Sequence, residues 1–467
     1  MRFELEELPL CETISRARVR RLRPGAHVAR STSRGGGGMS AREHAARHRQ
    51  PLARKWLIEQ DGNAALHFFV SFFITIIVAM LSLDLIWWFV LARFAADPLA
   101  RVMVHLFMAA QVIVFIWLIA GRVSGSGLDR LLPKFAVTNL FIWHFIGLGL
   151  LSTIAILSLP ILLLSKMVPS RNVQPQPAIA SNAWTRRDFL RFAAAISPPL
   201  FTLSASAIAL RQLNDFRIRR FRIDIPGLPS ELDGLTIAQV SDMHVGRFTS
   251  GRVLDRMVEA TNALQADLVL LTGDLINDAL ADLDHGIDLV RAMRARFGLF
   301  LIEGNHDLIE NADEFERRVK ACGIPFLLDE SAIVSVRGFS LQLLGLSWTR
   351  THGEGRDKAI GAAVNSLLAQ RQPDAFPILL AHHPHAFDAA AAAKIPLTLS
   401  GHTHGGQLML SEQLGFGPAM FRYWSGLYRR GASQLVVSNG VGNWFPLRVN
   451  APAEIIHITL RQAESIW

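Results

Sequence analysis

The chain has 467 residues, too many for one ordinary domain, and half of them are apolar. Its net charge of +9 comes largely from an arginine-rich N-terminus and from loops beside apolar stretches, where basic residues are expected next to membrane helices. We therefore predict no nucleic-acid partner, and two cysteines make a disulfide framework unexpected.

Residues 1–63 are rich in arginine and are interrupted by four glycines at positions 35–38. The segment has no sustained apolar period, so we expect it to be mostly disordered. Met39 follows the glycines, and the true start could be either Met1 or Met39.

Residues 64–212 are predicted to form a membrane region with about four apolar helices. These are Leu66–Leu91, Val102–Ala120, Val137–Leu164 and Phe192–Leu210. The first three reach the roughly 20 residues that a spanning helix needs. The fourth is weaker because it contains Ser197, Pro198 and Pro199. The pattern predicts a multi-pass protein of a bacterial-type inner (cell) membrane, with membrane lipid as a partner.

Three polar residues lie within these apolar segments. Asp84 is close to one end of the first segment, beside two tryptophans, and we interpret it as an interfacial residue. His105 and His144 are single histidines on apolar helices, and we expect them to serve packing and not ligation.

The fourth segment is preceded by a basic motif at 185–191 that resembles a twin-arginine export signal. A plain basic flank retained in the cytoplasm is the alternative. Both place the chain after Leu210 outside the cell, whereas a cytoplasmic N-terminus and four crossings would return it to the cytoplasm. We favour the extracytoplasmic placement, because the export-like arginines are the ones nearest to the following domain.

Residues 213–467 read as a mixed domain with five short motifs in a fixed order. The motifs are Ser241-Asp242-Met243-His244, Gly273-Asp274, Gly304-Asn305-His306-Asp307, Ala381-His382-His383-Pro384 and Gly401-His402-Thr403-His404-Gly405-Gly406. Each follows an apolar run that ends in a tight turn, and helical patterns lie between the runs. Near-continuous apolar strands separated by helices predict sheets covered by helices, with the polar residues at the strand ends.

These motifs resemble the calcineurin-like metallophosphoesterase superfamily over roughly the last half of the chain. The loop Ser438–Arg448, followed by Ala453-Glu454-Ile455-Ile456, is similar to the transmembrane branch of these enzymes. The resemblance implies an α/β fold, a four-layer α/β/β/α sandwich preceded by the transmembrane helical region.

The resemblance also implies two metal sites that share one carboxylate. The first site would contain Asp242, His244, Asp274 and His404, and the second would contain Asp274, Asn305, His382 and His402. Carboxylate, amide and imidazole ligands without thiolate suit two divalent ions of Mn, Fe or Zn. Such a pair would bind phosphate oxygens and activate a water for in-line attack.

Further residues are candidates for catalysis and substrate binding. By the same resemblance His306 would face the phosphate and assist the leaving group, and Asp307 could orient His306. Gly405 and Gly406 permit close approach of substrate, and Arg448 could hold a second anionic group or be a surface arginine on a structural turn. The aromatic and arginine-rich stretch Met420–Arg430 suits a membrane interface, a lipid-linked substrate or a packed lid.

The sequence thus predicts a metal-dependent hydrolase of phosphodiester or pyrophosphate bonds. Its substrate would be a phosphate-containing small molecule or a lipid-linked compound such as UDP-2,3-diacylglucosamine, an intermediate of lipid A biosynthesis. A non-catalytic metal-binding envelope module is one alternative. A membrane transporter or sensor with a regulatory hydrolase domain is another.

Overall fold

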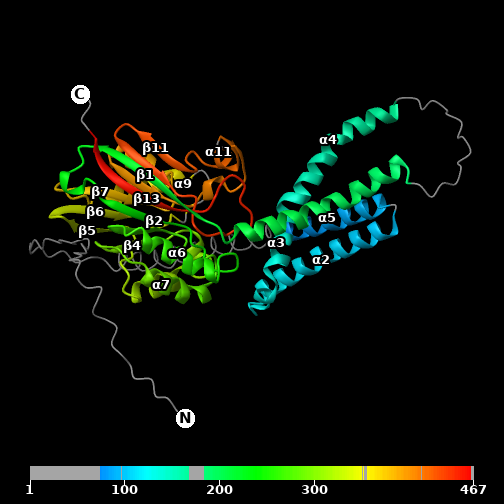
Figure 1. Cartoon of the computed structure of the whole chain (residues 1–467), viewed down its shortest axis with the longest axis horizontal. Coiled ribbons are helices and arrows are strands. Elements are labelled where there is room, and N and C mark those ends of the chain that lie inside the picture. The colour runs from blue at the N-terminus through cyan, green and yellow to red at the C-terminus, as the bar shows by residue number, and fades with distance from the viewer. Residues whose placement is uncertain are drawn as a thin grey trace, which may run out of the picture. The chain divides into compact units, whose positions relative to one another are not determined.

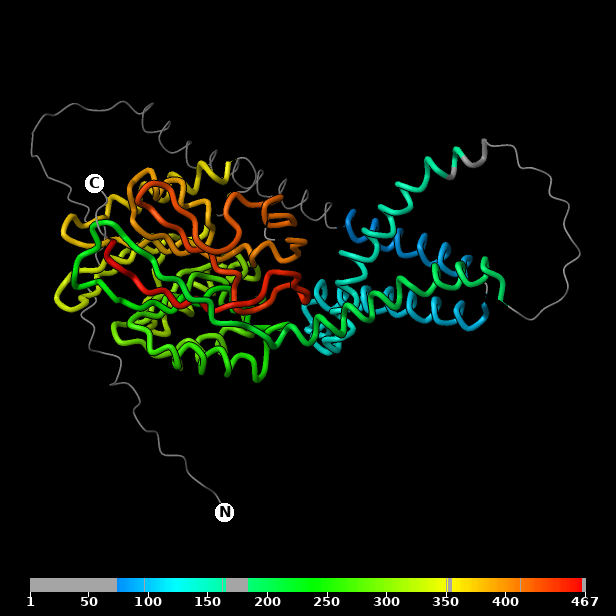
Figure 2. Tube along the Cα trace, turned by 45° about the horizontal axis from the view of Figure 1, so that its top comes forward, coloured from blue at the N-terminus to red at the C-terminus, as the bar shows by residue number. Residues whose placement is uncertain are grey.

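The computed structural model describes residues 74–95, 97–167, 184–349, 351, 355–411 and 413–463. The predicted disordered segment 1–63, with Met39, lies outside these residues. The described chain divides into two compact units, and the boundary falls at Ser206, inside a long helix. Figures 1 and 2 show a helical unit and a unit built from sheets and helices.

The first unit is helical. Its elements are the helix Ile74–Phe94, α2 (Pro98–Val123), the short 3-10 turn Leu128–Leu131, α3 (Lys134–Ile142), a π-helical turn Trp143–Gly147, α4 (Leu148–Met167) and most of α5 (Arg186–Gln212). Four helices in the described residues, Ile74–Phe94, Pro98–Val123, Lys134–Ile161 and Arg186–Gln212, are long and apolar enough to cross a membrane. The helix α5 runs through Pro198 and Pro199 without a break, so the fourth predicted segment is helical throughout.

The prediction that Asp84 is interfacial was wrong, because its carboxylate is fully buried inside the helical unit. Its Oδ1 accepts a hydrogen bond from Trp143 Nε1 at 2.8 Å, and its Oδ2 lies 3.0 Å from His144 Nε2. His144 also contacts the Leu140 carbonyl through Nδ1, at 2.9 Å. The π-helical turn carries both Trp143 and His144, so this widened turn presents two partners to one carboxylate.

The second unit contains two main sheets and a small hairpin. The five-stranded sheet has the order β1-β13-β2-β3-β4, and the six-stranded sheet has the order β11-β12-β8-β7-β6-β5. The strands are β1 (Arg217–Pro226), β2 (Thr236–Val240), β3 (Leu268–Thr272), β4 (Leu299–Ile302), β5 (Glu330–Val336), β6 (Phe339–Gly345), β7 (Ala375–Leu380), β8 (Leu397–Ser400), β9 (Met409–Ser411), β10 (Leu414–Gly415), β11 (Gly426–Arg430), β12 (Ser433–Val437) and β13 (Glu454–Ala463).

Helices cover both outer faces of the paired sheets. They are α6 (Arg252–Ala263), α7 (Leu283–Ala292), α8 (Ala312–Ala321), α9 (Arg356–Leu368) and α10 (Ala386–Ala392), and Figure 1 shows α6 and α7 on one side of the sheets. The short α11 (Phe416–Met420) lies against the small hairpin instead. One buried apolar cluster joins the inner faces of the two sheets, and it includes Ile237 and Ile378. A second cluster joins the five-stranded sheet to α6, α7 and α8, and a third joins the six-stranded sheet to α9 and α10. Three apolar layers between four layers of elements confirm the predicted α/β/β/α sandwich.

Strand direction decides where the polar motifs meet. β2, β3 and β4 run parallel in one sheet, and β7 and β8 run parallel in the other. Every residue of β3 is buried, which explains its continuous apolar sequence. The carboxyl ends of parallel neighbours share one edge of a sheet, so the loops after these strands are brought together.

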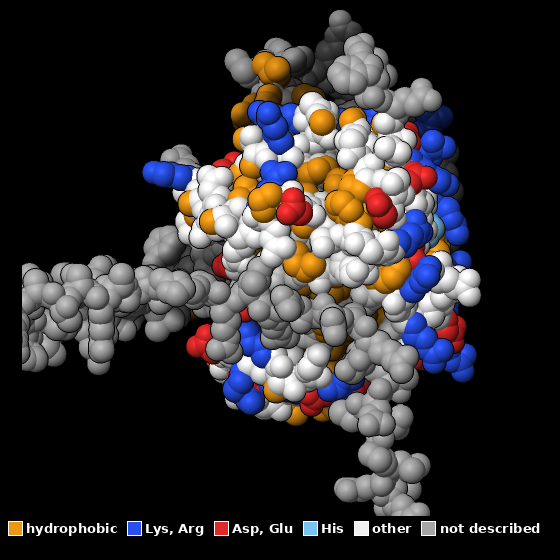
Figure 3. Space-filling model, turned by 90° about the vertical axis from the view of Figure 1, so that its left-hand side faces the viewer, with side chains coloured by type: hydrophobic (Ala, Val, Ile, Leu, Met, Phe, Trp, Pro, Cys, Tyr) orange, Lys and Arg blue, Asp and Glu red, His pale blue; other side chains and the backbone are white. Residues whose placement is uncertain are grey.

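One face of the sandwich carries side chains of all kinds. Figure 3 shows one face on which basic, acidic and apolar side chains are mixed, with lysine and arginine side chains gathered along one side. The apolar runs before the five motifs form strands with helices between them, as predicted. The sequence patterns did not reveal the short elements β9, β10, β11, α10 and α11.

We expect Asp84→Ala to lower the stability of the helical unit by about 1–3 kcal/mol, because it leaves buried donors of Trp143 and His144 unpaired. The thermal unfolding midpoint in detergent, followed by circular dichroism, measures the loss. Leu85→Ala is the matched control, since Leu85 is exposed, and it should change stability by less than about 0.5 kcal/mol. Equal midpoints for the two variants would contradict a structural role for the Asp84 pairing.

Candidate metal centre

The predicted ligands follow the carboxyl ends of five strands. Asp242 and His244 come after β2, and Asp274 comes after β3. The remaining four, Asn305, His382, His402 and His404, follow β4, β7 and β8. The two sheets therefore both contribute to one site, the first through three strands and the second through two.

The backbone of the site is strained at several of these positions. Asp242, His244, Asp274, His402 and His404 all have positive φ angles, of 54°, 46°, 56°, 74° and 49°. Such left-handed conformations are uncommon for residues with a side chain, and they persist where the surrounding structure enforces them. This strain indicates that the sharp turns are held in order to direct the side chains inward.

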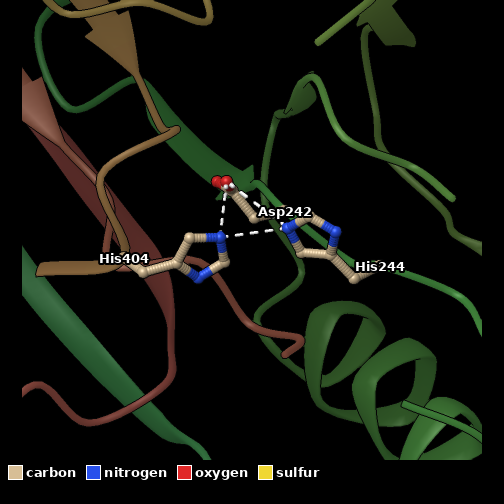
Figure 4. Close-up of side chains that lie close together, drawn as sticks. All are labelled: Asp242, His244 and His404. Carbon is tan, nitrogen blue, oxygen red and sulfur yellow. Dashed lines mark hydrogen bonds and ion pairs between the residues drawn. The ribbon is translucent and has the colours of Figure 1, made fainter. Parts of the chain in front are cut away.

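The first cluster consists of Asp242, His244 and His404 (Figure 4). The Nε2 atoms of His244 and His404 lie 3.0 Å apart, and His404 Nε2 is 3.3 Å from Asp242 Oδ1. His244 Nε2 is 3.9 Å from the same oxygen. All three residues are buried, so their ligand atoms face one another without bulk water between them.

The second cluster consists of Asp274, His382 and His402, with Asn305 beside it. Asp274 Oδ2 lies 3.1 Å from His382 Nε2, and His402 Nδ1 lies 2.8 Å from Asn305 Oδ1. The same Oδ2 of Asp274 is 3.6 Å from His244 Nε2 of the first cluster. The structure thus brings all seven predicted ligands together and places Asp274 between the two groups.

Burial and charge set the protonation of the site in the absence of metal. Burial lowers the pKa of His244, His402 and His404 well below the usual range, so these imidazoles are neutral. Burial also disfavours the charged form of His382, but the Asp274 carboxylate outweighs it and raises the pKa of His382 to about 9. Burial raises the pKa of Asp242 to about 6. At Asp274 burial acts in the same direction, yet the charges of His382 and His306 hold the pKa below its usual range.

The residues fit divalent metal ions. Two ring nitrogens, those of His244 and His404, face each other beside a carboxylate, an arrangement of lone pairs that a bound cation would stabilise. His382 Nε2 and His244 Nδ1 are buried and have no well-directed hydrogen bond among the described residues. Neutral imidazoles, carboxylates and an amide oxygen without thiolate are ligands for Mn, Fe or Zn.

His306 lies at the edge of both clusters. Its ring centroid is 4.5 Å from that of His244, and its backbone N–H donates to Asp274 Oδ1 at 2.8 Å. Its Nδ1 lies 2.6 Å from the Asn277 carbonyl oxygen. Because a carbonyl only accepts, Nδ1 carries the hydrogen, and Nε2 is the nitrogen available for chemistry.

The prediction that Asp307 orients His306 was wrong, because its carboxylate has other partners. It accepts hydrogen bonds from the backbone N–H groups of Asp274, Ile276 and Gly304, at 2.9, 3.1 and 2.9 Å. Burial raises the pKa of Asp307 well above its usual range, and the charge of Asp274 adds to this effect. Asp307 therefore ties together the turns that follow β3 and β4, and the Asn277 carbonyl orients His306.

Gly405 and Gly406 approach protein atoms and not an open surface, which corrects the prediction that they admit substrate. Both are buried, and a Cβ on Gly405 would lie 2.6 Å from the Asn439 side chain. A Cβ on Gly406 would lie 2.5 Å from the backbone of Gly417. Their φ angles of 64° and 81° also favour glycine.

Arg448 was a candidate for holding an anionic group of the substrate, but its guanidinium is buried and contacts protein atoms. Its Nη2 contacts His404 Nδ1 at 2.9 Å and donates to the Gly442 carbonyl at 2.6 Å. Its Nη1 donates to the carbonyls of Asn439 and Ala451, and its Nε donates to Asn443 Oδ1. All five N–H donors of the guanidinium are engaged, so Arg448 supports the His404 ring and the loop around it.

Sequence patterns missed two residues beside the centre, Trp348 and Glu303. The Trp348 ring lies 5.1 Å from His402 and 5.6 Å from His382, and its backbone N–H donates to the buried Glu303 carboxylate. His383 is buried and its ring lies 4.9 Å from that of His402, whereas its neighbour His385 pairs with Asp357. No spacing or motif marked Trp348 or Glu303, because only the folded chain brings their loops to the ligands.

Comparison with known proteins assigns the class of this domain. Residues 235–406 match the family model described as calcineurin-like phosphoesterase. The chain is 31% identical over 254 residues to a transmembrane protein with metallophosphoesterase domain of Danio rerio, covering 52% of this chain and 56% of the relative. It is 30% identical over 260 residues to a putative metallophosphoesterase of Caenorhabditis elegans, and the alignment covers 52% of each chain. It is 28% identical over 251 residues to the uncharacterized metallophosphoesterase YkuE of Bacillus subtilis, with 50% of this chain and 82% of the relative covered.

Residues 235–406 are thus similar to calcineurin-like phosphoesterases, and the relatives that the chain resembles include one named as a transmembrane protein with metallophosphoesterase domain. The alignments span about half the length of the first two relatives, 56% and 52%.

Metal affinity should rise with pH, because a proton on His382 competes with the metal below about pH 9 and one on Asp242 competes below about pH 6. We expect the affinity for Mn²⁺ to increase about tenfold per pH unit between pH 6 and 8, with release of about one proton. Isothermal titration calorimetry in buffers of different ionisation enthalpy measures both quantities. An affinity that is constant with pH would contradict the Asp274–His382 pairing.

We expect Arg448→Met to destabilise the domain by about 2–4 kcal/mol, because several buried carbonyls lose their donor. Urea unfolding of the full chain in detergent, followed by tryptophan fluorescence, measures the loss. Arg252→Met, at an exposed arginine, is the control and should change stability by less than about 0.5 kcal/mol. A weaker substrate affinity at unchanged stability would instead restore the substrate-binding role of Arg448.

Proposed function

We propose that this protein is a membrane-anchored binuclear phosphoesterase that hydrolyses a phosphodiester or pyrophosphate bond. The observation that carries the proposal is the position of Asp274. Its Oδ2 lies 3.6 Å from His244 of one ligand cluster and 3.1 Å from His382 of the other. One carboxylate within reach of two imidazole-rich clusters is the arrangement that two neighbouring ions need.

The residues divide between two ions as their positions suggest. Asp242, His244, Asp274 and His404 would hold the first ion, and Asp274, Asn305, His382 and His402 would hold the second. When bound, the ions supply positive charge to the phosphate oxygens and lower the pKa of a coordinated water, so that it can attack phosphorus.

His306 is placed to assist the leaving group. The Asn277 carbonyl fixes the ring through Nδ1, and the backbone N–H of His306 is fixed by Asp274. With Nδ1–H held by the carbonyl, a second proton would sit on Nε2, and from there the imidazolium would pass it to the oxygen that departs from phosphorus or stabilise the charge of that oxygen. Asp307 contributes indirectly, because it holds the turns that carry Asp274 and Asn305.

Arg356 replaces Arg448 as our candidate for binding a second anionic group. It lines a small cavity together with Trp348, His382 and His383. Its Nε is buried and has no hydrogen-bond partner among the described residues. A guanidinium with an unused donor beside the second ligand cluster suits a phosphate oxygen or a second phosphate group.

The substrate we propose is lipid-linked, with UDP-2,3-diacylglucosamine as one candidate. The support is the combination of four helices able to span a membrane with a phosphoesterase domain in one chain. We also propose an extracytoplasmic catalytic domain, because α5 begins at the two arginines of the export-like motif, Arg186 and Arg187. An extracytoplasmic site would favour a different lipid-linked substrate over UDP-2,3-diacylglucosamine, since that step of lipid A synthesis is cytoplasmic.

Hydrolysis assays on the full chain in detergent test the proposed function. The substrates are bis(p-nitrophenyl) phosphate, p-nitrophenyl phosphate and UDP-2,3-diacylglucosamine, each with and without added Mn²⁺. We expect metal-dependent turnover that Asp274→Ala abolishes, and we expect His306→Gln to lower kcat by about 10²–10⁴-fold while the metal content is unchanged. Asp288→Ala, at an exposed carboxylate, is the control and should retain wild-type turnover.

Metal analysis of the same samples separates the alternatives. Two bound ions per chain with no hydrolysis of any substrate would contradict an enzyme and support a metal-binding module. Equal loss of kcat and of metal in His306→Gln would contradict the assignment of His306 as a proton donor.

A further inference from the structure

The catalytic unit exposes apolar side chains mainly in one region. In the described residues after Gln212, seven large apolar side chains are exposed, and six of them lie between positions 410 and 449. Four of these, which we call the apolar cap, are Leu410 (77% exposed), Leu414 (59%), Phe416 (54%) and Met420 (65%). Large apolar side chains that are exposed close together in one segment of a domain indicate an interaction site.

The apolar cap is an ordered part of the fold. Leu410 and Leu414 belong to the hairpin of β9 and β10, and Phe416 and Met420 begin and end α11. The Gly417 N–H donates to the sulfur atom Sδ of Met409 at 3.3 Å, and the Phe416 N–H donates to the Leu408 carbonyl at 3.2 Å. The exposure of these side chains is therefore built into a hydrogen-bonded hairpin and helix.

The apolar cap is connected to the end of a candidate membrane span. The Met409 N–H donates to the Val449 carbonyl at 3.0 Å. The N–H of the preceding residue, Arg448, contacts Oε1 of Gln212, the last residue of α5, at 3.3 Å. Residues 206–212 belong to the same compact unit as the cap. The cap is thus linked, through Arg448 and Val449, to the point where α5 would leave the bilayer.

The apolar cap also adjoins the ligand loops. The hairpin begins five residues after His404, and the Phe421 ring, next to Met420, lies 5.7 Å from the His402 ring. Trp444, itself 39% exposed, lies 6.3 Å from His404 and 6.1 Å from His306. The connection between α5 and the first strand of the sandwich is short, since α5 ends at Gln212 and β1 begins at Arg217.

We propose that the apolar cap docks on the lipid bilayer in which α5 is anchored, so that the metal centre opens beside the membrane surface. The bilayer is the occupant that the structure favours, because the cap is hydrogen-bonded to the loop that contacts the end of a spanning helix. Exposed leucine, phenylalanine and methionine side chains are suited to the boundary between headgroups and acyl chains. The proposal deepens the proposed function, because a headgroup phosphate would then reach the ligands without leaving the membrane.

Nitroxide labels on the full chain test the docking directly. The labels are placed at Leu414→Cys or Ile309→Cys, in a chain with Cys11→Ser and Cys322→Ser, reconstituted in vesicles of phosphatidylcholine and phosphatidylglycerol. Ile309 is the matched control, because it is 57% exposed on the same unit but lies outside the cap. Collisions with oxygen report lipid, and collisions with a water-soluble nickel chelate report solvent.

We expect the label at Leu414 to be protected from the nickel chelate and accessible to oxygen, while the label at Ile309 shows the reverse. Nickel accessibility at Leu414 equal to that at Ile309 would overturn the docking. Spin–spin broadening at Leu414 that disappears on dilution with unlabelled chain would overturn it in favour of a second copy as the occupant. Neither reading depends on turnover, so a failed hydrolysis assay leaves this test intact.

A kinetic experiment connects the docking to the substrate. We expect the double variant Leu414→Ser with Phe416→Ser to raise KM for a diacyl lipid-linked substrate about tenfold, through lost apolar contact with the membrane. Its turnover of bis(p-nitrophenyl) phosphate should equal that of wild type, and Ile309→Ser should change neither. An unchanged KM for the diacyl substrate would overturn the delivery of substrate from the membrane.

Discussion

The Asp274 carboxylate is the charge around which the metal centre is assembled. It is buried and lies within 4 Å of ring nitrogens from both sheets, with His244 at 3.6 Å and His382 at 3.1 Å. The positive charge of His382 compensates its negative charge while no metal is bound, which is why the pKa values of the two groups move apart. Binding of divalent ions would replace the proton of His382, so folding prepares a site in which the metal displaces one proton.

Several buried residues around Asp274 hold the turns and rings that surround its carboxylate. Asp307 accepts hydrogen bonds from the backbone of two turns, and a Cβ at Gly304 would overlap the Asp274 carboxylate. Arg448 fixes His404 from the opposite side with a fully engaged guanidinium. These supports hold left-handed backbone at five ligand positions, a conformational cost that the packed sandwich around the site offsets.

The helical unit and the phosphoesterase domain each hold a buried carboxylate that is paired with neighbouring donors. Asp84 is satisfied by Trp143 and His144 from a π-helical turn, as Asp274 is by imidazoles and a backbone N–H. Unpaired, either carboxylate would be expensive to bury. The apolar cap presents the opposite situation, in which apolar side chains are exposed. Our proposal accounts for this exposure by contact with the bilayer that α5 would cross.

Local sequence indicated the main strands and helices and the candidate ligands. Apolar runs defined β2, β3, β4, β7 and β8, and the polar residues after each run were correctly expected to meet, because parallel strands end at one edge of a sheet. The long apolar helices were also predicted from the sequence, because an apolar stretch of about 20 residues is typical of a membrane-spanning helix. This covers most of the fold and all seven predicted ligands.

Tertiary structure alone decided the roles of residues whose partners are distant in the chain. Asp307 is adjacent to His306 in sequence but contacts the turn at Asp274. Arg448 is buried, and seven acceptor atoms, five from residues 439–451 and two from His404, converge on its guanidinium. Asp84 acquired its partners from a turn 59 and 60 residues away. Sequence periodicity indicates which face of an element is apolar. Hydrogen bonds between distant elements form only when the layers pack, so the partners of Asp307, Arg448 and Asp84 could not be predicted from the sequence.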